Sequence, residues 1–168
     1  VAMVTLGASL QLRSQTGRRI VRAEDFFLST MTTVLAANEL LTEIEVPALP
    51  ANCGWSYQEV SRRHGDFALA GAASVIALGD KGTIKQGRLT LPGATPIRAG
   101  EAEQPLLGKK PPEPLFKNAA ARATENLEQD SDIHASAEYR QSACHVLARR
   151  ALIQAAERAV ESAKGNSQ

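Results

Sequence analysis

Residues 61–71 read Ser-Arg-Arg-His-Gly-Asp-Phe-Ala-Leu-Ala-Gly, and they join two segments that predict neighbouring strands. Residues 57–63 belong to a stretch in which apolar and polar side chains alternate, which is typical of a half-buried strand. Residues 68–78 are nearly all apolar or small, as expected of a strand that is covered on both faces. Between them, Gly65 and Asp66 predict a turn.

The charge in this turn has two interpretations. The simpler one is a solvated hairpin loop that carries surface charges. In the other, the turn binds an anionic or polar ligand: Gly65 lets the backbone come close to it, and Asp66 orients hydrogen-bond donors. Arg62 or Arg63 would then face an anion. The residues of the turn alone leave both interpretations open.

On the C-terminal side, a turn at 79–82 and a strand at 84–91 extend the pair into a three-stranded antiparallel meander. Helical segments follow at 101–107, 115–127 and 137–163. The last of these carries small and apolar side chains on one face: Cys144, Leu147, Ala148, Ala151, Leu152, Ala155 and Ala159. We therefore predict an α+β fold in which an antiparallel sheet packs on helices.

On the N-terminal side, residues 8–22 predict a hairpin, and residues 38–47 predict a further strand that ends at a proline. Residues 47–52 contain two prolines and show no periodicity. We place a boundary there, between a first part over residues 1–50 and a second part over residues 51–168.

Composition narrows the class of protein. The 168 residues are 43% hydrophobic, which supports a core, and the net charge of +1 favours neither nucleic acid nor a membrane surface. No apolar run reaches the roughly 20 residues of a membrane span. Cys53 and Cys144 lie far apart and form no metal motif with the three histidines, which predicts free thiols in a cytoplasmic protein. Because the chain begins with Val1, we expect an N-terminal portion to be missing or to belong to another polypeptide.

Residues 130–140 form the second dense polar stretch, Asp-Ser-Asp-Ile-His-Ala-Ser-Ala-Glu-Tyr-Arg. We interpret them mainly as the start of the long helix, with Ser136 as its N-cap and Tyr139 packed toward the sheet. Asp132 and Arg140 could also contact a partner subunit.

Five motifs occur in an order that resembles one known family. They are Arg-x-Val-x-Ala-x-Asp-Phe-Phe at 19–27, Thr-x-Leu-x-x-x-Glu-Leu-Leu-x-x-Ile-x-Val-Pro at 33–47, Ser-Arg-Arg-x-Gly-Asp-Phe-Ala at 61–68, Gly-Ala-Thr-Pro-Ile-Arg at 93–98 and Asp-Ile-His-Ala-Ser-x-x-Tyr-Arg at 132–140. Each motif alone is weakly specific, whereas five in the same order are a strong signal. Over nearly its whole length, the chain resembles the FAD-binding (medium) subunit of the xanthine dehydrogenase and carbon monoxide dehydrogenase family, the molybdenum hydroxylases.

The resemblance implies a domain organisation. Residues 1–50 would be the C-terminal part of the second FAD-binding subdomain. Residues 51–168 would be the C-terminal domain of CO dehydrogenase flavoprotein type, a three-stranded antiparallel sheet packed on helices. Family subunits are much longer, and their N-terminal portion carries the glycine-rich loops that hold the FAD pyrophosphate. Those loops do not occur in this sequence.

The resemblance also implies an activity and partners. The chain would be an FAD-dependent oxidoreductase subunit of a molybdenum-containing dehydrogenase. In this family a large subunit with the molybdenum cofactor hydroxylates the substrate, and electrons pass through 2Fe–2S clusters of a small subunit. FAD then delivers them to NAD, oxygen or another acceptor.

The resemblance also implies which residues contact the flavin, because several positions of the motifs match flavin contacts of the family. Leu41 matches an apolar residue that packs on the flavin, and Tyr57 and Gln58 match a strand whose side chains approach the isoalloxazine. Some relatives carry a lysine in place of Gln58. Residues 63–66 match the loop beside the flavin ring, where Asp66 is a stronger candidate than the arginines. The predicted cofactor-binding residues are Leu41, Tyr57, Gln58, Arg63, Gly65 and Asp66.

The sequence leaves two other functions open. The chain alone could be a scaffold that docks the iron–sulfur and molybdenum subunits and holds no FAD, because the phosphate-binding loops do not occur in it. A nucleic-acid-binding module, suggested by the arginine pairs at 62–63 and 149–150, is disfavoured by the net charge of +1.

Overall fold

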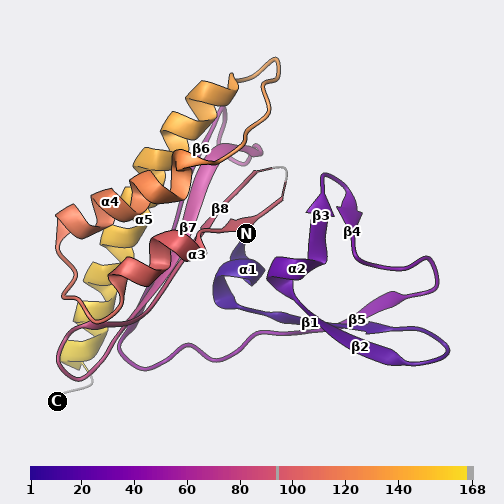
Figure 1. The fold of residues 1–168 in the computed structure, drawn as a ribbon, viewed down its shortest axis with the longest axis horizontal. Helices are drawn as coiled ribbons and strands as arrows, with labels where there is room; N and C mark the ends of the chain where they lie inside the picture. Colours follow the sequence, from indigo (N-terminus) through magenta and orange to yellow (C-terminus); the bar gives the residue numbers. More distant parts are fainter. Residues whose placement is uncertain (94, 166–168) are drawn as a thin grey trace.

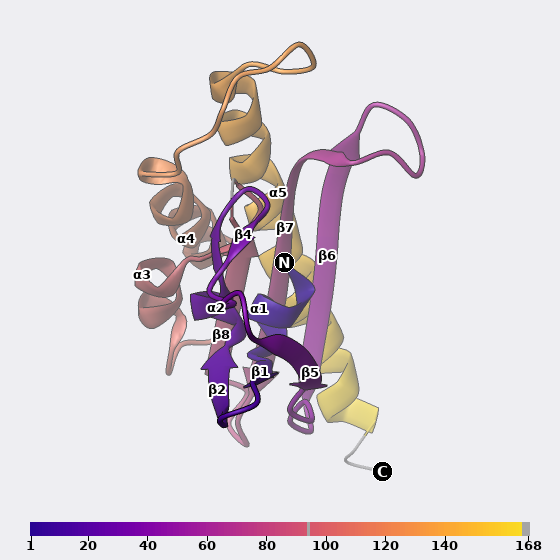
Figure 2. The same ribbon diagram turned by 90° about the vertical axis from the view of Figure 1, so that its right-hand side faces the viewer.

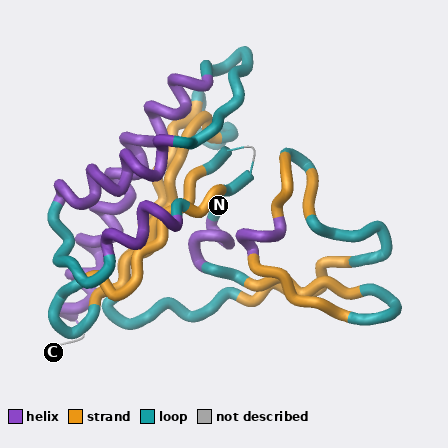
Figure 3. Tube along the Cα trace, viewed as in Figure 1, coloured by secondary structure: helices purple, strands orange, loops and turns teal. Residues whose placement is uncertain are grey.

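The computed structural model describes residues 1–93 and 95–165, and these form two parts joined by an extended linker (Figure 1). The N-terminal part, residues 1–45, consists of short strands and short helices. The C-terminal part, residues 53–165, sets long strands against helices, as Figure 3 shows by secondary structure. The linker that joins them contains the two prolines that suggested the boundary.

The N-terminal part is built on a three-stranded antiparallel sheet of order β2-β1-β5, to which a β3–β4 hairpin and two short helices are attached. The hairpin and the strand expected within 38–47 are both confirmed. The elements are α1 (Ala2–Leu6), β1 (Ser9–Arg13), β2 (Arg18–Arg22), α2 (Ala23–Phe26), β3 (Phe27–Ser29), β4 (Thr32–Thr33) and β5 (Leu40–Glu45).

The C-terminal part contains an antiparallel sheet of order β6-β7-β8-β9, followed by helices. The elements are β6 (Cys53–Ser61), β7 (Ala68–Leu78), β8 (Ile84–Leu91), β9 (Ile97–Arg98), α3 (Gly100–Glu103), the 3-10 helix η1 (Gln104–Leu106), α4 (Glu113–Glu125) and α5 (Ala137–Gly165).

The three long strands are the predicted meander, with two differences at its margins. Strand β6 ends at Ser61 rather than at residue 63, because Arg62 and Arg63 already belong to the turn. Strand β9 adds two residues at the far edge, since the chain folds back along β8 after Pro96. The motif at 93–98 includes position 94, which lies outside the described residues.

The sheet of the C-terminal part is covered on both faces along β7. Helices α4 and α5 lie on one face, and α1 lies against the other face (Figure 2). Ala72 and Ile76 pack in the core with the helices, whereas Ala73 and Val75 point toward α1. This explains the almost wholly apolar sequence of β7. Cys144 is also buried in the core, and both cysteines are free thiols, as predicted.

The long helix α5 packs very closely on the edge strand β6. A Cβ on Gly54 would collide with backbone atoms of Ala155 and Ala159, so only a glycine allows this crossing. At the start of the helix, the Ser136 hydroxyl accepts the N–H of Tyr139 at 3.2 Å, which confirms the predicted N-cap.

Candidate functional site

Trp55 and Tyr57 lie on the face of β6 opposite the one that packs on α5, and 56% and 45% of their surfaces are exposed. The Arg158 guanidinium of α5 nevertheless lies 4.9 Å from the centre of the Trp55 ring. A cavity of about 320 Å³ lies between this face and α1, lined mainly by apolar groups. Ala2, Leu6 and Leu49 line it opposite the two aromatic rings. The cavity therefore lies between the two parts of the molecule and takes its walls from both.

The Tyr57 hydroxyl remains protonated over a wide pH range. Partial burial raises the pKa of Tyr57, and the neighbouring Glu59 carboxylate raises it further. An aromatic ring with a neutral hydroxyl suits contact with a flat, partly apolar ligand, since the hydroxyl can still donate a hydrogen bond.

Gln58 lies on the opposite face of β6 from Tyr57, because successive side chains of a strand alternate. Its side-chain amide donates to Ser56 Oγ at 3.3 Å and to Gln154 Oε1 of α5 at 3.0 Å. The expectation that the side chains of Tyr57 and Gln58 approach one flavin together does not agree with this geometry. The Gln58 amide instead joins the strand to the long helix.

The turn between β6 and β7 is closed by its own polar groups. Asp66 pairs with Arg62 at 3.1 Å and accepts the N–H of Phe67 at 2.9 Å. Gly65 has a φ of 84°, which other residues rarely adopt, and the space beside its Cα is open. The Arg63 side chain is exposed. Asp66 therefore shapes the turn, and Arg63 and the Gly65 backbone form its accessible surface.

The turn is also tied to the segment that precedes α5, a connection that sequence reasoning missed. Arg62 Nη1 lies 2.9 Å from His134 Nδ1. Asp132 accepts the N–H groups of His134 and Ala135 at 2.8 and 3.0 Å and pairs with Arg140 at 2.7 Å. These bonds, the two backbone N–H groups first, lower the pKa of Asp132 to about 2. The two polar stretches of the sequence thus form one structure.

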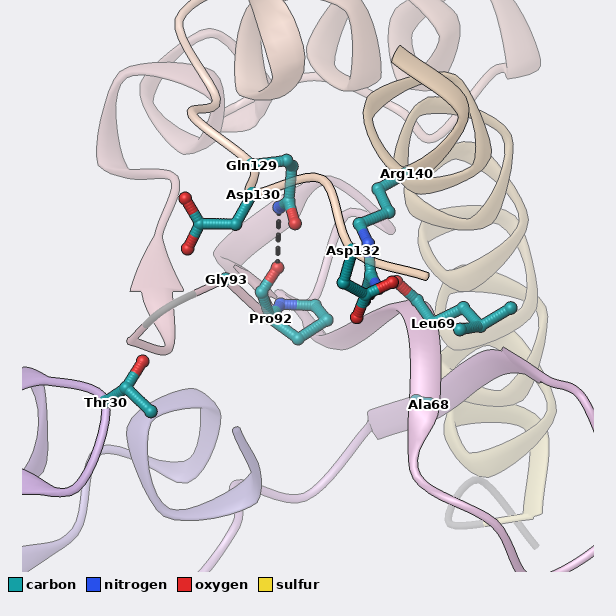
Figure 4. Close-up of a pocket in the computed structure, with 9 residues that line it drawn as sticks. All are labelled: Thr30, Ala68, Leu69, Pro92, Gly93, Gln129, Asp130, Asp132 and Arg140. Carbon is teal, nitrogen blue, oxygen red and sulfur yellow. Dashed lines mark hydrogen bonds and ion pairs between the residues drawn. The ribbon is translucent and has the colours of Figure 1, made fainter. Parts of the chain in front are cut away.

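A second, polar cavity of about 200 Å³ opens beside this structure (Figure 4). It lies between Thr30 in the β3–β4 turn, the start of β7, and the segment from Gln129 to Asp132. The Gln129 amide donates to the Pro92 carbonyl at 3.0 Å across one wall. Arg140 crosses another wall, where its Nη1 donates to the Leu69 carbonyl at 3.0 Å.

The structure brings only some of the predicted contacts together. Arg63, Gly65 and Asp66 share one turn, and Tyr57 lies on the strand that leads into it. Leu41 lies on β5 opposite Leu12 and is 38% exposed. Figures 1 and 2 both show β5 away from the end of the long sheet that carries the turn. Leu41 is therefore separate from the other candidates.

Two family models match the chain in succession. Residues 55–155 match the CO dehydrogenase flavoprotein C-terminal domain, and residues 1–49 match the FAD binding domain in molybdopterin dehydrogenase. The first match includes Tyr57 and the whole β6–β7 turn.

Curated relatives match over almost the whole chain. The 6-hydroxypseudooxynicotine dehydrogenase complex subunit alpha of Paenarthrobacter nicotinovorans is 33% identical over 161 residues, covering 95% of this chain and 54% of that subunit. The caffeine dehydrogenase subunit beta of a Pseudomonas species is 37% identical over 163 residues, covering 95% of this chain and 55% of that subunit. The chain thus spans about half the length of the curated relatives it matches.

Solved structures agree with these matches. A carbon monoxide dehydrogenase from Hydrogenophaga pseudoflava, which lacks the Mo-pyranopterin moiety of its molybdenum cofactor, superposes with a TM-score of 0.89 at 36% identity. The superposition covers 94% of this chain and 55% of that one.

Among the described residues, none of the helices is both long enough and apolar enough to cross a membrane.

Proposed function

Because the chain belongs to the family of FAD-binding medium subunits of molybdenum-containing dehydrogenases, we propose that it carries electrons from 2Fe–2S clusters through FAD to an acceptor. The family assignment confirms the resemblance drawn from the five motifs, with its α+β fold and with FAD as the family's cofactor. It also confirms the prediction of an FAD-dependent oxidoreductase family.

This proposal rests on the cavity between the two parts of the molecule. Tyr57 lines this cavity and lies within the segment that matches the family model. A volume of about 320 Å³ is at the low end for small-molecule sites, so it suits part of a dinucleotide, such as its ring system. Bound FAD would supply the one- and two-electron chemistry. In our proposal Tyr57 packs on the ring; Gly65 and Asp66, which do not line this cavity, stay predicted contacts.

The remaining predictions stay proposals. Leu41, Gln58 and Arg63 complete the candidate contacts, although Gln58 could act only through its backbone or through Ser56 and Gln154. We keep the division into residues 1–50 and 51–168, which two separate hydrophobic cores support. An iron–sulfur small subunit and a molybdenum-binding large subunit are the proposed partners, and the cytoplasm is the proposed location.

A flavin titration of the chain tests this proposal, with Tyr57→Ala and Gln58→Ala as matched variants on opposite faces of one strand. FAD binding is followed by quenching of flavin fluorescence. We expect saturable binding that Tyr57→Ala weakens at least about fivefold, since an aromatic contact contributes on the order of 1 kcal/mol or more. Gln58→Ala should leave the affinity within about twofold. Equal effects of the two variants would show that the ring does not lie on the Tyr57 face.

The scaffold interpretation remains the alternative, because the sequence contains no phosphate-binding loops. It predicts no saturable FAD binding by this chain up to millimolar flavin. Binding tighter than roughly micromolar would exclude it. In a pull-down with the purified iron–sulfur and molybdenum subunits of a family complex, the scaffold interpretation predicts that the flavin-free chain is still retained.

A further inference from the structure

The motif at 93–98 helped to indicate the family, yet its final arginine has no role in the proposed flavin site. Arg98 lies on β9 and pairs in register with Thr90 of β8. Its side chain reaches two carboxylates that belong to different parts of the molecule. One is Glu103 of the C-terminal part, and the other is Glu24 of the N-terminal part.

Glu103 fixes the Arg98 guanidinium on the C-terminal part. Arg98 Nε lies 3.2 Å from both carboxylate oxygens of Glu103, and Nη2 lies 2.8 Å from one of them. Glu103 is only 4% exposed, and it also accepts the N–H of Leu89 at 3.0 Å. A buried carboxylate with this many donors holds the planar guanidinium in one orientation.

The remaining nitrogen of Arg98 faces across the boundary. Arg98 Nη1 donates to Glu24 Oε2 of α2 at 3.1 Å, and the other oxygen of Glu24 contacts Arg22 at 2.6 Å. Glu24 is therefore the carboxylate through which the N-terminal part binds the fixed guanidinium. A lysine could not reproduce this arrangement, because its single nitrogen lacks the planar fork with which Arg98 contacts Glu103 through two nitrogens and Glu24 through the third.

Arg88 forms a second connection between the parts. Its Nη1 donates to the Thr5 carbonyl of α1 at 3.2 Å. A Cβ on Gly7 would collide with this guanidinium, so the end of α1 is shaped to accept it. Arg22, Arg88 and Arg98 thus gather around the carboxylates of Glu24 and Glu103. Removal of Glu24 would leave the three cations with one carboxylate between them.

Both arginines share a face of the sheet with the cavity. In register, Arg88 lies across from Val75, and Val75 lies across from Trp55. In the neighbouring row of paired residues across the sheet, Tyr57 pairs with Ala73, Ala73 with Thr90, and Thr90 with Arg98. Directly paired residues of neighbouring strands point to the same side. The arginines therefore hold α1 and α2 at the β8–β9 side, and the cavity opens at the β6 side.

We propose that Arg98 is a positioning residue, which through Glu24 holds the N-terminal part against the sheet and so sets the width of the cavity behind Trp55 and Tyr57. These contacts hold the two parts together whether or not FAD occupies the cavity. The experiment therefore needs no flavin, and a failed flavin titration would leave the proposal standing.

The test uses Glu24→Gln, which removes the carboxylate charge that pairs with Arg98 across the boundary and leaves the Arg98–Glu103 pair intact. Trp55 is the single tryptophan and lines the cavity, so its quenching by acrylamide reports the opening. We expect the quenching constant to rise, and hydrogen exchange in α1 and β1 to accelerate at least about threefold, with β7 unchanged. Glu39→Gln is the control, because it breaks a comparable pair with Arg19 inside the N-terminal part.

Two results would overturn the proposal. One is a Glu24→Gln variant with wild-type quenching of Trp55, and the other is an equal increase in the Glu39→Gln control. If Glu24→Gln fails to fold, salt provides the same test on the wild-type chain. Near 1 M salt the Debye length is about 3 Å, so quenching of Trp55 should rise with salt if the contact is ionic. Quenching that does not change with salt would contradict the proposal.

Discussion

The two parts of the molecule bury their apolar residues to very different extents. Among the described residues, the core of the C-terminal part contains 21 buried residues, whereas that of the N-terminal part contains six. Every residue of β5 is exposed, while β7 is buried along nearly all its length. The difference indicates that the C-terminal part provides most of the stability, and that the N-terminal part depends more on contacts across the boundary.

The strongest test of this comparison uses two leucines that are both fully buried, one in each part. Leu152→Ala opens a cavity between α5 and the sheet, within the larger core. We expect it to lower the free energy of unfolding by about 3–5 kcal/mol. Urea unfolding followed by Trp55 fluorescence measures this cost.

Leu10→Ala removes the same atoms from β1 in the smaller core. We expect a cost of about 2 kcal/mol, at the low end for such substitutions, because a small core with an open neighbouring strand can relax. Native-state hydrogen exchange should show faster exchange in β1 and β5 and no change in β7. Equal costs for Leu10→Ala and Leu152→Ala would contradict the comparison.

The smallest effect on stability is expected when the charge is removed from one of two carboxylates, one in each part. The pKa values of both are lowered to about 2. In Glu39 the main cause is the hydrogen bond from Arg19, and in Asp132 it is the backbone N–H groups of His134 and Ala135. Because each folded pKa lies below the ordinary value, the stabilisation is present above about pH 4 and is lost as the pH falls toward 2.

Asp132→Asn and Glu39→Gln remove the charge and keep an oxygen acceptor. Each should lower the urea midpoint at pH 6, and the difference from wild type should disappear near pH 2. At pH 6, high salt should reduce the effect of Glu39→Gln more, since its partner is an exposed arginine. If salt reduced the effects of both variants equally, the backbone N–H groups would not be the main cause of the lowered pKa of Asp132.

Local sequence patterns were sufficient for most of the fold. The alternation before Ser61 and the apolar run after Phe67 predicted β6 and β7, and the face of small residues predicted α5 against the sheet. The same alternation of strand residues also separates Tyr57 from Gln58, and its consequence for the site could have been drawn from sequence. Motif matching placed both residues on one strand and ignored the face on which each side chain lies.

The polar contacts between residues far apart in the chain could not be predicted from the sequence, for a different reason. Arg62 meets His134 across 72 positions, and Arg98 meets Glu24 across 74. No local periodicity links such residues, and each one reads as an ordinary surface charge. Only the packing of the sheet on α5 and of α1 on the sheet brings these groups within hydrogen-bond distance.

The crossing of β6 over α5 at Gly54 limits how this chain can vary in length. An inserted residue would rotate the rest of the helix by about 100°. Larger side chains would then replace Ala155 and Ala159 beneath a strand that has no room even for a methyl group. In natural variants we therefore expect insertions and deletions in the loop at 107–112, and an unchanged number of residues in α5.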